Sequence, residues 1–177
     1  MRSRSTHFVL LLALALGGNS VYGQGSSGAG PKRARTPDDY KPRTLKELAA
    51  EGDGGQGLGN KEETMVVHGR ILPSRVRAAY AGTTRPLPPI KREVLRQWAR
   101  LYAGSPEGYT EPYQTEALFI EDGAEHWLAV RKRDLPRLRQ GLKKGEAADL
   151  YLIRVGAAKA GGGWELVLLV ESFRKPN

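Results

Sequence analysis

The pattern of apolar and polar positions predicts several β-strands in the chain after residue 63. Thr64–Leu72 is rich in β-branched residues and stops at Pro73, so it predicts a first strand that can bend and continue through Arg75–Arg77. Glu116–Glu121 and Glu125–Arg131 flank Asp122-Gly123, the dipeptide that most strongly favours a two-residue hairpin turn.

Two further strands are predicted near the C-terminus, at residues 148–155 and 164–173. The last one places Trp164, Leu166, Leu168 and Val170 on one face, and it has apolar side chains on the other face as well. Apolar residues on both faces indicate a strand that is covered on both sides or wrapped into a barrel.

A different spacing, close to 3.6 residues, predicts a helix that starts after Pro88-Pro89 and ends at Gly104. Its apolar face is expected to close over the core and consists of Ile90, Val94, Trp98 and Leu101. A second, short helix is predicted from Asp134 to Gln140, with Pro136 in its first turn and Gly141 just past its end.

This order of elements resembles the OB-fold, a five-stranded Greek-key barrel with a helix between its third and fourth strands. The resemblance covers roughly residues 64–174 and implies a mainly β barrel with one inserted helix and one short helix. The connection between the first two strands, about forty residues, is longer than a normal loop. We expect its helix to cap an open end of the barrel. An SH3-like barrel and an open antiparallel α+β sheet are the alternatives.

Residues before the barrel lack a strong apolar pattern. Residues 24–60 are rich in glycine and basic residues and predict a flexible tether, with a short helix at residues 45–51 that begins with a capping box at Thr44 and Glu47. The packed domain, residues 61–177, is therefore expected to begin near Lys61.

The first 23 residues have the pattern of a secretory signal peptide. Arg2 and Arg4 precede nine consecutive apolar residues, Phe8–Leu16, and a small, polar segment follows. Nine apolar residues are too few to span a bilayer. The pattern predicts cleavage after Gly23 and export to the periplasm or the extracellular space.

The composition sets the net charge of the chain and excludes every function that requires cysteine. The chain has 177 residues and a formal charge of +9, which becomes +7 once Arg2 and Arg4 are removed. It has no cysteine, so thiol catalysis, thiolate metal sites and disulfides are excluded.

The sequence has no motif that is specific for catalysis or for binding a cofactor. Gly52–Gly57 matches GxGxxG, but the strand that should precede a dinucleotide-binding loop is missing. His68 and His126 lack partners at metal-ligand spacing. We therefore predict no catalytic residue, no metal site and no cofactor. The carboxylates near the hairpin, Glu121, Asp122 and Glu125, keep an envelope-directed hydrolase open as an alternative.

The densest charged segment runs from Arg131 to Lys144 and holds seven basic residues against Asp134. Such a cluster attracts polyanions, including acidic glycans, lipid headgroups and nucleic acid. We call these residues the basic cluster: Arg131, Lys132, Arg133, Arg137, Arg139, Lys143 and Lys144.

A second candidate surface is the groove of the expected barrel, where aromatic and basic residues combine as they do in proteins that bind single-stranded nucleic acid. Its candidates are Arg75, Arg77, Phe119, Trp127, Arg131 and Lys159. The register of the hairpin decides the role of Trp127. A two-residue turn puts it on the face of Leu118 and Ile120, whereas a three-residue loop puts it opposite Phe119.

Together these patterns predict an exported, non-enzymatic binding or adaptor module that contacts an anionic ligand, such as a polyanion, or another envelope protein. The leucine and valine positions expected in its core are Val67, Leu118, Leu128, Leu152, Leu166 and Leu168.

Overall fold

The computed structural model of the protein describes residues 35–53, 64–69, 71–160 and 163–176. The predicted signal peptide, residues 24–34 and most of the GxGxxG match lie outside the described residues. Within these ranges, none of the helices is long and apolar enough to cross a bilayer.

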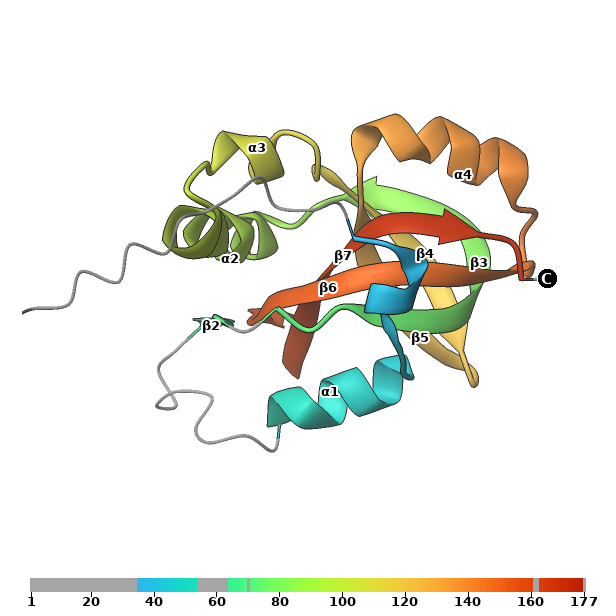
Figure 1. Cartoon of the computed structure of the whole chain (residues 1–177), viewed down its shortest axis with the longest axis horizontal. Coiled ribbons are helices and arrows are strands. Elements are labelled where there is room, and N and C mark those ends of the chain that lie inside the picture. Colours follow the sequence, from blue (N-terminus) through green and yellow to red (C-terminus); the bar gives the residue numbers. More distant parts are fainter. Residues whose placement is uncertain (1–34, 54–63, 70, 161–162, 177) are drawn as a thin grey trace, which may run out of the picture. The chain divides into compact units, whose positions relative to one another are not determined.

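Five strands close into a barrel, which confirms the predicted fold class (Figure 1). The strands are β3 (Ser74–Pro86), β4 (Thr115–Glu121), β5 (Ala124–Val130), β6 (Ala147–Ala160) and β7 (Gly163–Arg174). They pair in the order β3-β4-β5-β7-β6, and β6 returns to β3. β5 and β7 run parallel, whereas the other barrel pairs are antiparallel.

Two short strands extend this sheet. β1 (Lys41–Pro42) runs parallel to the start of β3, and β2 (Met65–Val67) pairs with the second half of β6. The sequence predicted one strand where the structure has β2 and β3, because the chain leaves the sheet between His68 and Pro73. β3 also continues to Pro86 through an irregularity at Gly82, where φ is +80°. The connection to β4 is therefore residues 87–114, shorter than predicted.

The hairpin between β4 and β5 has the predicted two-residue turn. Asp122 and Gly123 both have positive φ, 50° and 82°, as a type I′ turn requires. Leu118 pairs with Trp127 across the hairpin, so the two share a face. That face is the outside of the barrel, since Phe119 and Leu128 of the neighbouring positions lie in the inner core.

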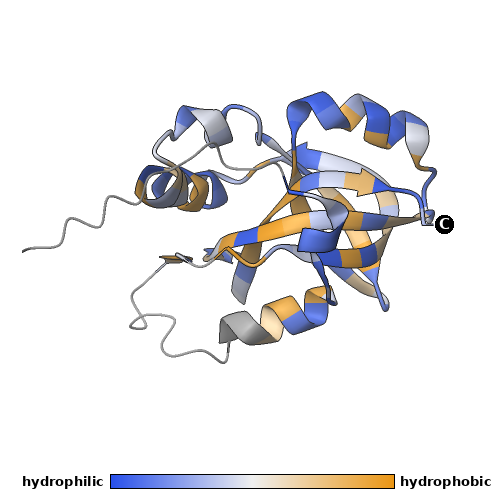
Figure 2. Ribbon diagram, viewed as in Figure 1, coloured by the Kyte–Doolittle hydropathy of each residue, from blue (hydrophilic) through white to orange (hydrophobic). Residues whose placement is uncertain are grey.

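The apolar positions form two clusters, one inside the barrel and one outside, as the two-sided pattern of the last strand indicated. Figure 2 shows hydrophobic positions along β6 and on the helices α1 (Leu45–Asp53) and α2 (Pro89–Trp98). Leu128, Leu152 and Leu168 lie inside, as predicted. Leu118 is buried on the outer face. Val67 and Leu166 are half-buried and pack at the edges of the outer and inner clusters respectively.

The inserted helix α2 (Pro89–Trp98) forms as predicted and covers the outer face of β6 and β7. It does not cap an end of the barrel. Val94 and Trp98 are fully buried there, but Leu101, predicted to join them, is 64% exposed. The chain changes to a π-helix over Ala99–Ala103 before Gly104, and the wider turn carries Leu101 off the buried face. A short helix, α3 (Glu107–Thr110), follows.

Leucines from two other helices complete the inner core. They come from α1 (Leu45–Asp53) and from α4 (Leu135–Gly141), which follows the short 3-10 helix η3 (Lys132–Asp134). α1 has the predicted capping box, because Thr44 N donates to Glu47 Oε2 at 2.8 Å and Glu47 N donates to Thr44 Oγ1 at 3.0 Å.

The packed part of the chain begins well before Lys61. Another 3-10 helix, η1 (Pro37–Asp39), and β1 precede α1, and Tyr40, Leu45 and Leu48 are all buried. The tether predicted for residues 24–60 is therefore wrong for residues 35–50. Leu45 and Leu48 lie in a polar segment, so the local sequence did not indicate that they are buried. Their packing partners lie in the barrel strands, which are distant in the sequence.

Candidate functional site

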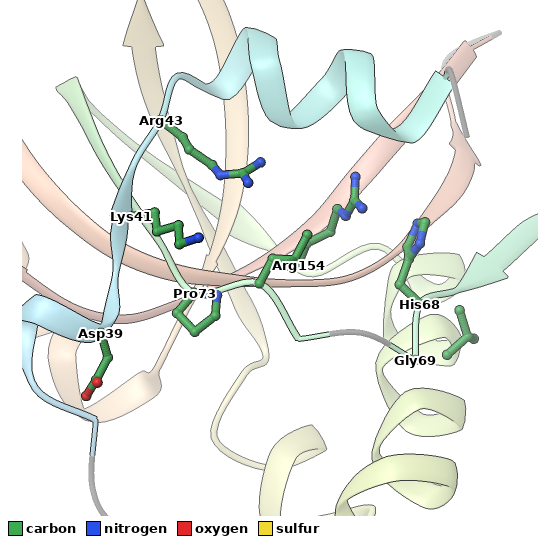
Figure 3. A pocket seen from close by; sticks show the side chains of 9 residues that line it. Asp39, Lys41, Arg43, His68, Gly69, Pro73 and Arg154 are labelled. Carbon is green, nitrogen blue, oxygen red and sulfur yellow. The ribbon is translucent and has the colours of Figure 1, made fainter. Parts of the chain in front are cut away.

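A pocket of about 560 Å³ opens beside α1, and the basic residues Lys41, Arg43 and Arg154 are among those that line it (Figure 3). We call it the cationic pocket, and its lining residues are Asp39, Lys41, Arg43, Val67, His68, Gly69, Leu72, Pro73 and Arg154. Figure 3 shows the Arg43, Arg154 and His68 side chains extending into the space below α1. The volume falls within the range of small-molecule sites.

Backbone pairing positions these side chains. Lys41 N donates to Pro73 O at 3.2 Å and Arg43 N donates to Arg75 O at 2.9 Å, which fixes the segment around β1 against β3. His68 N donates to Val155 O at 3.0 Å, so the chain after β2 stays beside β6.

Arg154 comes from β6 and is the most buried cation of the pocket, with 7% of its surface exposed. Its Nη1 donates to Leu48 O in α1 at 3.2 Å. A buried guanidinium is costly unless hydrogen bonds or counter-charges compensate for its lost hydration. The bond to Leu48 O, which forms because α1 packs beside β6, is one such hydrogen bond.

Cations outnumber carboxylates among the described residues that line this pocket. Three cations lie around it, whereas Asp39 is the one carboxylate among its described lining residues. The Asp39 carboxylate already accepts hydrogen bonds from Thr36 N and Oγ1, at 2.6 and 3.0 Å. Burial lowers the pKa of His68, and the charge of Arg154 lowers that pKa further. The imidazole is therefore neutral at pH 7.

The basic cluster is not one continuous free surface. Arg131 Nε donates to the buried Tyr113 hydroxyl, Arg137 Nη2 donates to Phe173 O, and Arg139 Nη2 donates to Thr84 Oγ1, each at 2.8 Å. These three guanidinium groups fasten the segment from Arg131 through α4 to the barrel. Arg133, Lys143 and Lys144 are exposed around α4.

The other predicted site residues are scattered as well. Arg77 forms an ion pair with Asp149 at 2.8 Å on an exposed edge, and Arg75 is half-buried beneath the segment around β1. Phe119 cannot stack on a ligand, because it is fully buried in the barrel at 5.7 Å from the ring of Tyr80. The alternation of β4 puts Phe119 inside, so its assignment to a binding surface is corrected.

Trp127 lines a second concavity, and Lys159 lies close to another tryptophan of its lining. Trp127 is half-buried on the outer face of β5, with the Arg85 guanidinium 4.1 Å from its ring centre. Lys159 Nζ lies 5.4 Å from the ring centre of Trp164, which lines the same concavity as Trp127.

The hairpin carboxylates do not form an acid–base pair. Glu121 accepts from Leu45 N at 2.6 Å and from Lys46 N at 3.2 Å, so it holds the first turn of α1. Glu125 pairs with Ile120 in the hairpin register and therefore points to the opposite face from Glu121. This arrangement gives the hydrolase alternative no support.

Sequence reasoning missed Lys41, Arg43 and Arg154 as site residues and treated His68 only as a strand histidine. Lys41 and Arg43 lay in the segment interpreted as a tether. Arg154 did carry a signal, because it interrupts the otherwise apolar run Leu150–Val155 of a predicted strand.

Neither the family models nor the curated proteins compared with this sequence give a match. Across the part of the chain that the structure describes, no three His, Cys, Asp or Glu side chains come together as a potential metal site.

Proposed function

We propose that this protein is an exported, non-enzymatic binding module that holds a small anionic group in the cationic pocket. The observation that carries the proposal is the convergence of Arg43, Lys41 and the buried Arg154 on one pocket with a single carboxylate. Cations gathered around a pocket raise the local concentration of anions there.

The barrel itself supports a binding role. Counted from β3, its strands pair in the order 1-2-3-5-4-1, with α4 between the third and fourth strands. This is the order expected of an OB-fold, and we infer that the barrel belongs to that architecture. Fold alone does not define a ligand, so the choice of an anion rests on the pocket.

Arginine favours phosphate, sulfate or carboxylate as the group bound. The guanidinium of Arg154 has five N–H donors in a planar fork, and Leu48 O occupies one of its terminal nitrogens. Arg43 and Lys41 add charge from the side of β1. Charge-assisted hydrogen bonds of this kind contribute about 1.5–3 kcal/mol each.

His68 makes the proposed binding sensitive to pH. An anion beside the imidazole stabilises its protonated form and raises the pKa that Arg154 and burial have lowered. Binding therefore takes up a proton, and affinity increases as the pH falls through the range in which the imidazole of the bound state titrates. Sulfate suits this measurement because it does not titrate in that range.

Calorimetric titration with sulfate and pyrophosphate, at ionic strength held constant with chloride, tests the proposal. The Lys41→Gln/Arg43→Gln variant should lose about tenfold or more in affinity. The Arg133→Gln/Lys144→Gln variant removes the same charge from the exposed surface around α4 and should keep the wild-type affinity.

Two results would overturn the proposal. One is the absence of saturable binding of either anion to the folded protein. The other is an equal loss in both double variants, because that would show a general effect of net charge rather than a site.

A further inference from the structure

A second pocket lies between the first halves of β5 and β7 and shares no lining residue with the cationic pocket. Within the described residues, these parallel strands pair at Ala129 with Leu169 and at Val130 with Val170. The strands before those positions leave a pocket of about 350 Å³. We call it the indole pocket, and its lining residues are Leu45, Ala49, Lys91, Glu125, His126, Trp127, Leu128, Trp164, Glu165, Leu166 and Leu168.

Two tryptophans from different strands line this pocket, and each has a cation near its ring. The Arg85 guanidinium lies 4.1 Å from the ring centre of Trp127, and Lys159 Nζ lies 5.4 Å from that of Trp164. Arg85 is itself fixed, because its Nε donates to the buried Glu116 carboxylate at 2.8 Å. The Arg85 guanidinium covers one face of the Trp127 ring and holds the ring rigid, so a ligand that requires a rigid aromatic surface packs on the opposite face.

Charges around the indole pocket balance. The cations Arg85, Lys91 and Lys159 face the carboxylates Glu116, Glu125 and Glu165. Lys91 Nζ lies 2.7 Å from Glu116 Oε1 and 2.8 Å from Glu165 Oε2. A polyanion would meet the carboxylates of Glu125 and Glu165 at the pocket wall, so the balance disfavours nucleic acid here.

Hydrogen-bonding groups stand next to the apolar surfaces. Burial lowers the pKa of His126, so its imidazole is neutral at pH 7 and carries one donor and one acceptor. Glu125 is exposed at the wall, and both cations near Glu165 approach its Oε2 atom. Glu165 Oε1 and the Glu125 carboxylate can therefore accept hydroxyl protons from a ligand.

We propose that the indole pocket binds an uncharged sugar ring. A pyranose has an apolar face of C–H groups, which carry slight positive charge and pack on the negative face of an indole. Its edge carries hydroxyl groups that donate to carboxylates and imidazole. The pocket combines both kinds of surface, the charges on its wall and next to it balance, and its volume is about 350 Å³. This site is independent of the anion proposed for the cationic pocket.

Fluorescence titration with neutral trisaccharides of glucose, galactose and N-acetylglucosamine tests this proposal. At least one should give a saturable change in tryptophan emission with an affinity in the millimolar range or tighter. The third tryptophan, Trp98, is 1% exposed, so its fluorescence should not change when a sugar binds. Trp127→Ala and Trp164→Ala should each weaken binding by about tenfold, and Trp127→Phe by less.

Control variants separate the two sites. Lys41→Gln/Arg43→Gln should bind the sugar as the wild type does, and Trp127→Ala should keep the sulfate affinity. The proposal is overturned if none of the three trisaccharides binds the folded wild type. It is also overturned if both tryptophan variants keep their affinity, or if oligothymidylate saturates the same signal while the sugars do not.

Discussion

The buried ion pair between Lys91 in α2 and Glu116 in β4 is predicted to fasten the inserted helix to the barrel. Each residue is 1% exposed, and the Glu116 carboxylate receives both Lys91 Nζ at 2.7 Å and Arg85 Nε at 2.8 Å. Replacing Glu116 with glutamine leaves Lys91 buried, with Glu165 as its remaining carboxylate. Removing one partner of a buried pair costs about 3–5 kcal/mol.

We expect Glu116→Gln to lower the free energy of unfolding by about 3 kcal/mol, the lower end of that range, because Glu165 still compensates for part of the Lys91 charge. Urea denaturation followed by tryptophan fluorescence measures this loss. The matched control is Glu111→Gln, which changes an exposed carboxylate and should stay within about 0.5 kcal/mol of the wild type.

A double-mutant cycle shows whether the loss comes from the pair. Adding Lys91→Met to Glu116→Gln removes the buried charge, so the double variant should be less destabilised than the two single losses added together. The expected coupling is about 1–3 kcal/mol. Strictly additive losses, or an unchanged midpoint for Glu116→Gln, would refute the reasoning.

Three further predictions concern the core, the surface and pH. Leu152→Ala should cost about 2–5 kcal/mol in chemical denaturation, because Leu152 is fully buried in the inner core; an unchanged midpoint would contradict its placement. On a heparin column, changing Arg133, Arg137, Arg139 and Lys143 to glutamine should lower the salt needed for elution through lost counterion release, whereas equal elution would leave the basic cluster a solvated face. The lowered pKa values of His68 and His126 mean that the unfolded chain binds protons first as the pH falls below about 6.5. Stability should therefore decline below that pH, and less so in the variant lacking both histidines; identical pH profiles would contradict the burial of the imidazoles.

Local sequence patterns were sufficient for the barrel because its signals are short-range. The type I′ turn at Asp122-Gly123 fixes the hairpin register, and apolar residues on both faces of β7 correspond to an inner and an outer core. The helix from Pro89 was recognisable by its periodicity, but that pattern assumes 3.6 residues per turn. The π-helical turn after Trp98 breaks this assumption, which is why Leu101 was misplaced.

The candidate sites depend on contacts between distant segments, and these left little trace in the sequence. Glu121 belongs to the hairpin in sequence, yet its carboxylate accepts amide protons from the first turn of α1. The cationic pocket draws residues from β1, from the chain after β2, and from β6. The basic cluster was conspicuous because it is contiguous, but three of its arginines make internal hydrogen bonds.

The most direct test of the central claim is the position of an anion in a crystal of this protein. Selenate is a sulfate analogue, and its selenium atom scatters X-rays anomalously. In crystals soaked in selenate, the anomalous signal would locate each bound anion directly, whichever residues bind it. The account predicts a peak within hydrogen-bonding distance of the Arg154 guanidinium and beside Arg43 or His68. Peaks confined to Arg133, Lys143 and Lys144 around α4, or an empty cationic pocket in a well-ordered crystal, would contradict it.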